Sequence, residues 1–130
     1  MIELRGAEIH PPGGRITFVV RQINVRFNTP ETVTVVLIDD EFSMVTEEGF
    51  REYGHSIIED DEYYIIVAAR REELNVAGIV GYQYGLYLQH FLGCEQDHEE
   101  AVLFAKYVNA QSSKYPISLM DALNAAGESR

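Results

Sequence analysis

The stretch EELNVAGIVGYQYGLYLQHFLG, residues 72–93, is the longest helical pattern in the chain. Acidic residues stand in its first turn and Gly93 follows its last apolar residues, which is the usual sequence pattern of a helix start and a glycine C-cap. Gly85 lies inside the pattern, where glycine costs a helix roughly 1 kcal/mol relative to alanine. The stretch therefore predicts one helix over 72–92, and Gly85 predicts that another element packs closely against it.

A second helix is expected after a short polar link. Asp97 and Glu100 have the spacing of a capping box, in which each residue satisfies a free backbone N–H group at the helix start. Four apolar residues then repeat at the amphipathic spacing i, i+3, i+4, i+7, namely Ala101, Phe104, Ala105 and Val108. After Pro116, a short final helix is expected over 119–126.

The first half of the chain predicts strands. VTVVLI (33–38) is rich in β-branched residues, and GHSII (54–58) and EYYIIVAA (62–69) are separated by an acidic turn, as in an antiparallel hairpin. Residues 2–9 alternate weakly and predict a further strand. Residues 15–28 fit either a helix or a strand, because a helical apolar face competes with a high content of β-branched residues.

These elements predict an α+β fold in one domain over residues 1–130. The expected architecture is a small, mostly antiparallel sheet that contains 33–38 and 63–69 and packs against the long central helix and the second helix. A chain of 130 residues with 46% hydrophobic content can bury a core of this size.

Composition excludes several classes of function. Ten Lys and Arg stand against 21 Asp and Glu, and the net charge of −11 disfavours direct binding to nucleic acid or to an anionic membrane surface. The single cysteine, Cys94, cannot form an intramolecular disulfide. Neither a secretory leader nor an apolar run of membrane-spanning length is evident, so a soluble, cytoplasmic protein is expected.

The pentad YQYGL, residues 82–86, lies in the middle of the long predicted helix. In the pattern H-E-x-x-H, two histidines four residues apart share a helix face and hold zinc, while the glutamate activates bound water. The residues around YQYGL resemble those around that pattern in the zincin family, particularly its small gluzincin and ImmA/IrrE-type members. YYIIVAA precedes the helix, GIV leads into the pentad, YLQHFLG follows it, and EEAVLFAKYV (99–108) is similar to the segment that carries the family's third ligand.

The resemblance implies a zincin-like fold with a degenerate metal site. Tyr82 and Leu86 would stand at the two histidine positions and Gln83 at the glutamate position. Glu100, or else Glu99, would stand at the third ligand position. Tyrosine is a poor zinc ligand at neutral pH, leucine binds no metal, and glutamine cannot act as a general base. Ordinary zinc-peptidase activity is therefore not expected, and neither is a cofactor.

The leading functional hypothesis is a catalytically inactive zincin-like domain that acts as a protein-binding or regulatory module. Its contact surface would be formed by Tyr82, Gln83, Tyr84, Tyr87 and Glu100, because tyrosine is favoured at protein interfaces. The simpler alternative is that these aromatic residues belong to an ordinary buried helix.

Two other classes of function stay open. His90, Cys94 and His98 follow one another at spacings of four, and on one uninterrupted helix they would form a displaced metalloenzyme site. Gly93 and the polar link CEQD are expected to break that helix. The acidic composition would also suit an inhibitor or structural protein, including one of viral origin, that occupies the nucleic-acid-binding groove of a basic partner.

Overall fold

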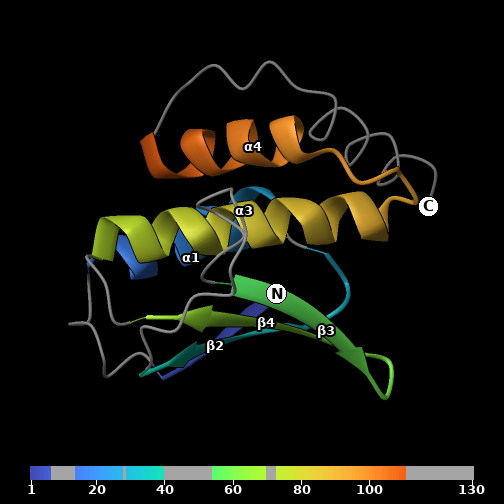
Figure 1. Ribbon diagram of the computed structural model, residues 1–130, viewed down its shortest axis with the longest axis horizontal. Helices are drawn as coiled ribbons and strands as arrows, with labels where there is room; N and C mark the ends of the chain where they lie inside the picture. The colour runs from blue at the N-terminus through green and yellow to red at the C-terminus, as the bar shows by residue number, and fades with distance from the viewer. Residues whose placement is uncertain (7–13, 28, 40–53, 70–72, 111–130) are drawn as a thin grey trace.

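The computed structural model describes residues 1–6, 14–27, 29–39, 54–69 and 73–110, which form an α+β fold (Figure 1). The elements in chain order are β1 (Ile2–Arg5), α1 (Arg15–Arg26), β2 (Val33–Ile38), β3 (Gly54–Glu59), β4 (Glu62–Ala68), α3 (Glu73–Phe91) and α4 (His98–Ala110). The predicted α+β class is confirmed, and so are the long helix, the second helix and the strands that precede them. The helix expected over 119–126 and the end of the strand expected over 2–9 lie outside the described residues.

The strands of this part of the chain form one mixed sheet in the order β1-β2-β4-β3. β1 pairs parallel with β2 and β2 pairs parallel with β4, whereas β3 pairs antiparallel with β4. The expectation of a mostly antiparallel sheet is therefore wrong. For β1 and β2 the physical reason is helix α1, which returns the chain to the end of the sheet where β1 began, so that β2 runs parallel to β1. β2 and β4 are parallel because β4, the second strand of the hairpin, lies beside β2 and β3 lies outside it.

Helix α1 resolves the two interpretations of residues 15–28. Its buried residues Ile16, Val19 and Ile23 lie on one face against the core, and Phe27 directly after it is also fully buried. Burial of an apolar face supplies most of the stability of a helix in a protein, so it outweighs the strand preference of the β-branched residues.

The hairpin between β3 and β4 closes through Asp60 and Asp61. Their φ angles are 51° and 63°, and positive φ at both central residues is what a two-residue hairpin turn of the right twist requires. The predicted acidic turn between two antiparallel strands is thereby confirmed.

Three layers stack in the molecule, as Figure 1 shows. The sheet forms the first layer, α1 and α3 cover one of its faces, and α4 lies on the far side of α3. Helix α3 is consequently enclosed by the sheet on one side and by α4 on the other. This position explains why its residues from Val76 to Gln89 are buried nearly all the way round the helix.

The C-cap predicted at the end of α3 is confirmed, and the capping box predicted at the start of α4 forms in part, because the Asp97 N–H group donates to Gln89 Oε1 instead of to the Glu100 side chain. Gly93 has a φ of +72°, its N–H group donates to the His90 carbonyl over 3.1 Å, and the Cys94 N–H group donates to the Gln89 carbonyl over 2.9 Å. Such bonds satisfy carbonyl groups that a helix end leaves free. At the start of α4, the Asp97 Oδ1 atom accepts the Glu100 N–H group over 3.1 Å.

Two glycines allow α4 to approach α3. A Cβ atom added at Gly81 would lie 3.1 Å from the Ala105 Cα atom, and one added at Gly85 would lie 3.2 Å from the Ala101 Cα atom. The close packing predicted from Gly85 is therefore confirmed. The alanines on α4 complete this contact between small residues.

The change Gly81→Leu is expected to lower the free energy of unfolding by about 2–3 kcal/mol, because a large side chain must force the two helices apart. Urea denaturation followed by circular dichroism measures this loss. Lys106→Leu, which adds an apolar side chain on the exposed side of α4, is the control and should shift the midpoint little. Equal stability of Gly81→Leu and the parent would contradict the tight α3–α4 contact.

Candidate functional site

The pentad position Tyr82 is part of the interior between α3 and α4. Its side chain is fully buried, its hydroxyl lies 2.8 Å from the Nδ1 atom of His98, and the two rings meet edge to face with centroids 5.3 Å apart. Leu86, one helical turn later, is half-buried and packs with Tyr82 against Ala101 and Ala105. Positions 82 and 86 thus share one face of α3, and that face is turned to α4.

Gln83 faces a different neighbour, the edge strand β3. Its Nε2 atom donates a hydrogen bond of 3.0 Å to the Gly54 carbonyl, and the side chain is buried. Gly54 is packed so closely on α3 that an added Cβ atom would lie 2.7 Å from the Ile79 Cγ2 atom. The amide of Gln83 therefore acts as a tie between α3 and β3.

The tyrosines Tyr84 and Tyr87 are also fully buried. The Tyr84 hydroxyl donates to the Phe27 carbonyl over 2.9 Å, while the Tyr87 hydroxyl lies 2.7 Å from the Thr29 Oγ1 atom and donates to the Glu31 Oε2 atom over 3.3 Å. Burial raises the pKa of Tyr84 and is the main reason that the pKa of Tyr87 is raised to about 12. Both side chains join α3 to the segment after α1, so in this structure neither belongs to an exposed contact surface.

Glu100, in the first turn of α4, lies beside Gln89 near the end of α3. The Gln89 Nε2 atom donates to the Asp97 carbonyl over 2.8 Å and to the Glu100 Oε1 atom over 3.1 Å, and the Gln89 Oε1 atom accepts the Asp97 N–H group over 3.0 Å. The carboxylate of Glu100 thus takes part in a hydrogen-bonded cap that fixes the link between α3 and α4. Its position in the sequence indicates a ligand, whereas in the structure its carboxylate accepts a hydrogen bond from the buried amide of Gln89.

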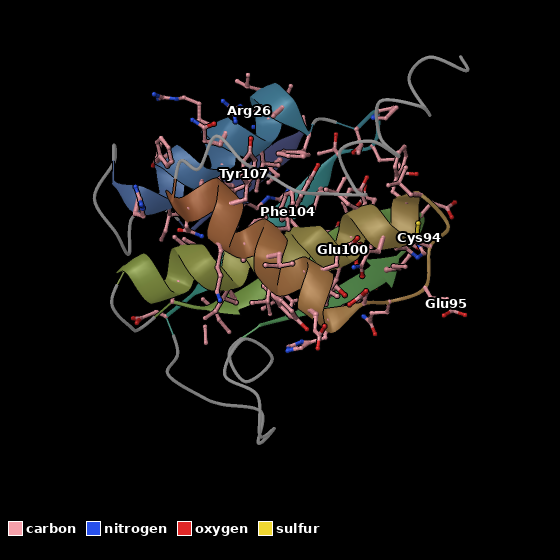
Figure 2. The ribbon with its side chains drawn as sticks, turned by 90° about the horizontal axis from the view of Figure 1, so that it is seen from above. Arg26, Cys94, Glu95, Glu100, Phe104 and Tyr107 are labelled. Carbon is pink, nitrogen blue, oxygen red and sulfur yellow. The ribbon has the colours of Figure 1, made fainter. Side chains whose placement is uncertain are left out.

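The stripe His90, Cys94 and His98 is not brought together. Helix α3 ends at Phe91, and Cys94 is exposed in the link. His98, on α4, is hydrogen-bonded to Tyr82 on α3. Figure 2 shows Cys94 and Glu95 on the link at one end of the molecule. Within the described ranges, no three His, Cys, Asp or Glu side chains are grouped so that they could hold a metal ion. The break predicted at Gly93 is the reason.

Sequence reasoning missed the outer edge of β3. In the part of the chain that the structure describes, β3 pairs with β4 on one side and with no strand on the other. Ile57 is 37% and Ile58 58% exposed. The adjacent isoleucines in GHSII are a signal for an exposed apolar side chain on this strand, because successive residues point to opposite faces and only one of the two can face the helices. The unpaired edge itself has no signal in these residues.

The chain matches no protein-family model, no curated protein and no solved structure. Among the helices that the structure describes, none is long and apolar enough to cross a membrane.

Proposed function

We propose that this chain is a catalytically inactive, zincin-like module that binds another protein through the outer edge of β3. The observation that carries the loss of catalysis is the bonding of the pentad itself. Tyr82 is bonded to His98 and Gln83 to the Gly54 carbonyl, so two of the three positions that would hold or activate a zinc-bound water instead stabilise the interior. The third, Leu86, packs against apolar side chains of α4.

The choice of β3 as contact surface replaces the tyrosine surface expected from the sequence, because those tyrosines are buried. An unpaired strand edge offers backbone N–H and C=O groups to a further strand. Proteins usually protect such an edge with lysine, proline or a bulge, and the sequence of β3, GHSIIE, contains neither lysine nor proline. Its exposed isoleucines add apolar contact area to the backbone groups.

The charge around this edge indicates the kind of segment that would bind. Glu59, Asp60, Asp61 and Glu62 follow the two isoleucines and are all exposed. Complementary charge favours encounter and sets the register of a bound segment. The proposed partner is therefore an extended segment with apolar residues for the isoleucines and Lys or Arg next to the acidic turn.

Selection from a displayed library of short random peptides tests this function. Selected peptides should combine apolar and basic residues, and the double change Ile57→Lys with Ile58→Lys should weaken their binding about tenfold or more, since lysine protects a strand edge and repels a basic segment. The matched control is Leu103→Lys, because Leu103 is 48% exposed but lies on α4. Peptides that bind the double variant as tightly as the parent would refute the proposed surface.

A further inference from the structure

A cavity lies between α1 and α4, away from β3 and from the pentad. It has a volume of about 240 Å³ and is lined by Gln22, Arg26, Tyr107 and Val108. Figure 2 shows Arg26 on α1 and Tyr107 on α4 next to each other. A guanidinium N–H group of Arg26 donates to the Tyr107 hydroxyl, and the guanidinium carbon lies 5.8 Å from the centre of the tyrosine ring.

The charge of Arg26 has no carboxylate partner among the described residues. Among the residues that the structure describes, an arginine–carboxylate pair within 4.0 Å is formed by Arg5 and Glu3, at a distance of 3.9 Å on the exposed sheet end, and Arg26 takes part in none. Its hydrogen-bond acceptor is the hydroxyl of Tyr107. A cation that keeps its full charge at the wall of a cavity is available to an anion that enters.

Helix α1 as a whole is basic in an acidic chain. Its sequence, RITFVVRQINVR, holds Arg15, Arg21 and Arg26 and no acidic residue, although the chain has 21 Asp and Glu. A cation in the last turn also interacts favourably with the helix dipole. The dipole accounts for the position of Arg26 along α1, but it gives no role to Gln22, a further polar residue that lines the same cavity.

We propose that this cavity binds a small organic or inorganic anion through a carboxylate or phosphate group. The guanidinium of Arg26 offers N–H donors that match such an oxyanion, and the side-chain amide of Gln22 supplies a further donor. Val108 and the tyrosine ring form the apolar part of the wall. Pockets for drug-sized ligands measure roughly 300–1,000 Å³, so the volume here suits an anion about the size of benzoate or phosphate rather than a nucleotide. The site is independent of the proposed function of β3.

Titration of ¹⁵N-labelled protein with sodium benzoate and, separately, with inorganic phosphate tests the site at constant ionic strength. Saturable shifts are expected for the backbone N–H signals of Gln22, Arg26 and Val108 and for the side-chain N–H signals of Gln22 and Arg26. Saturation by benzoate alone would support a carboxylate ligand with an apolar body, and saturation by phosphate alone would support a phosphate ligand. Failure of both probes to saturate would overturn the proposal.

Two variants of α1 separate a built site from general attraction to a basic helix. Arg26→Gln should weaken binding about tenfold or more, because it removes a charged hydrogen-bond donor. Arg21→Gln removes the same charge from an exposed position that does not line the cavity, and it should change the affinity by no more than about twofold at moderate salt. Equal weakening by the two changes would overturn the proposal. Tyr107→Phe keeps the ring but removes the acceptor of the Arg26 hydrogen bond, and an intermediate loss would support a role of this bond in positioning the guanidinium.

Discussion

A variant with Tyr82→His, Gln83→Glu and Leu86→His is expected to bind zinc with a Kd of about 1 μM or below, which corresponds to about 8 kcal/mol of binding free energy. Positions 82 and 86 share the face of α3 that packs on α4, so histidines there would lie on the same side of the helix. The Nδ1 atom of His98 already lies 2.8 Å from the Tyr82 hydroxyl. Three imidazole groups with a fourth position open are a known arrangement for zinc.

The structure changes the third ligand that this experiment should use. Glu100 was the candidate from the sequence, but its carboxylate accepts a hydrogen bond from the Gln89 amide, whereas His98 on α4 forms a hydrogen bond with position 82. Isothermal calorimetry should therefore show that adding His98→Ala to the triple variant weakens zinc binding about tenfold or more, because a metal ligand is lost. Adding Glu100→Gln should leave the affinity nearly unchanged. The opposite order would restore Glu100 as the third ligand.

A failure to fold must be kept apart from a failure to bind zinc. Gln83→Glu removes the donor to the Gly54 carbonyl, and an unsatisfied buried group costs about 1–3 kcal/mol. The double variant Tyr82→His with Leu86→His keeps that donor and still supplies both new histidines. A folded double variant without zinc affinity would sink the assignment of 82 and 86 to the zincin positions and leave α3 as an ordinary core helix.

The ends of α3 and α4 could be predicted from the sequence because local groups determine them. Gly93 is needed for positive φ, and Asp97 satisfies a backbone N–H group three residues on. The direction of the strands could not be predicted in the same way. For β1 and β2 it depended on whether residues 15–28 form a crossover helix, and the burial that decides this comes from α3 and the sheet, far along the chain. For β2 and β4 it depended on which strand of the hairpin pairs with β2, which no local pattern determines.

The sequence does contain a signal that Tyr82, Tyr84 and Tyr87 are buried, and the hypothesis that they form a protein interface leaves it unused. Residues 76–89 carry apolar or aromatic side chains on every face of the helix, and a helix that is apolar all round is a buried helix. The hydrogen-bond partners of Tyr82 and Tyr107 could not be predicted from the pattern of apolar residues. Tyr82 meets His98 across a helix break, and Arg26 and Tyr107 are 81 residues apart in the chain.

The folded protein is expected to lose on the order of 3–4 kcal/mol of stability between pH 10 and pH 12, through the buried hydroxyls of Tyr84 and Tyr87. An unfolded tyrosine has a pKa near 10, whereas burial raises the pKa of Tyr84 and raises that of Tyr87 to about 12. Below pH 10 both states keep the proton and the stability is fully present. Above it the unfolded chain loses protons that the folded chain retains, so unfolding becomes more favourable as the pH rises.

Urea denaturation at pH 8, 10, 11 and 12 measures this slope, which should reach about 1.4 kcal/mol per pH unit for each buried tyrosine. Tyr84→Phe and Tyr87→Phe give the matched comparison. Each removes a hydrogen bond, from the Phe27 carbonyl or from the Thr29 hydroxyl, and so lowers the stability at pH 8 by about 1 kcal/mol. Each also removes one titrating group, so the double variant should lose the part of the alkaline slope that these tyrosines cause. A double variant whose stability falls with pH as steeply as that of the parent would show that these hydroxyls are not shielded from solvent, and helix α3 would then not be the enclosed middle layer of the fold.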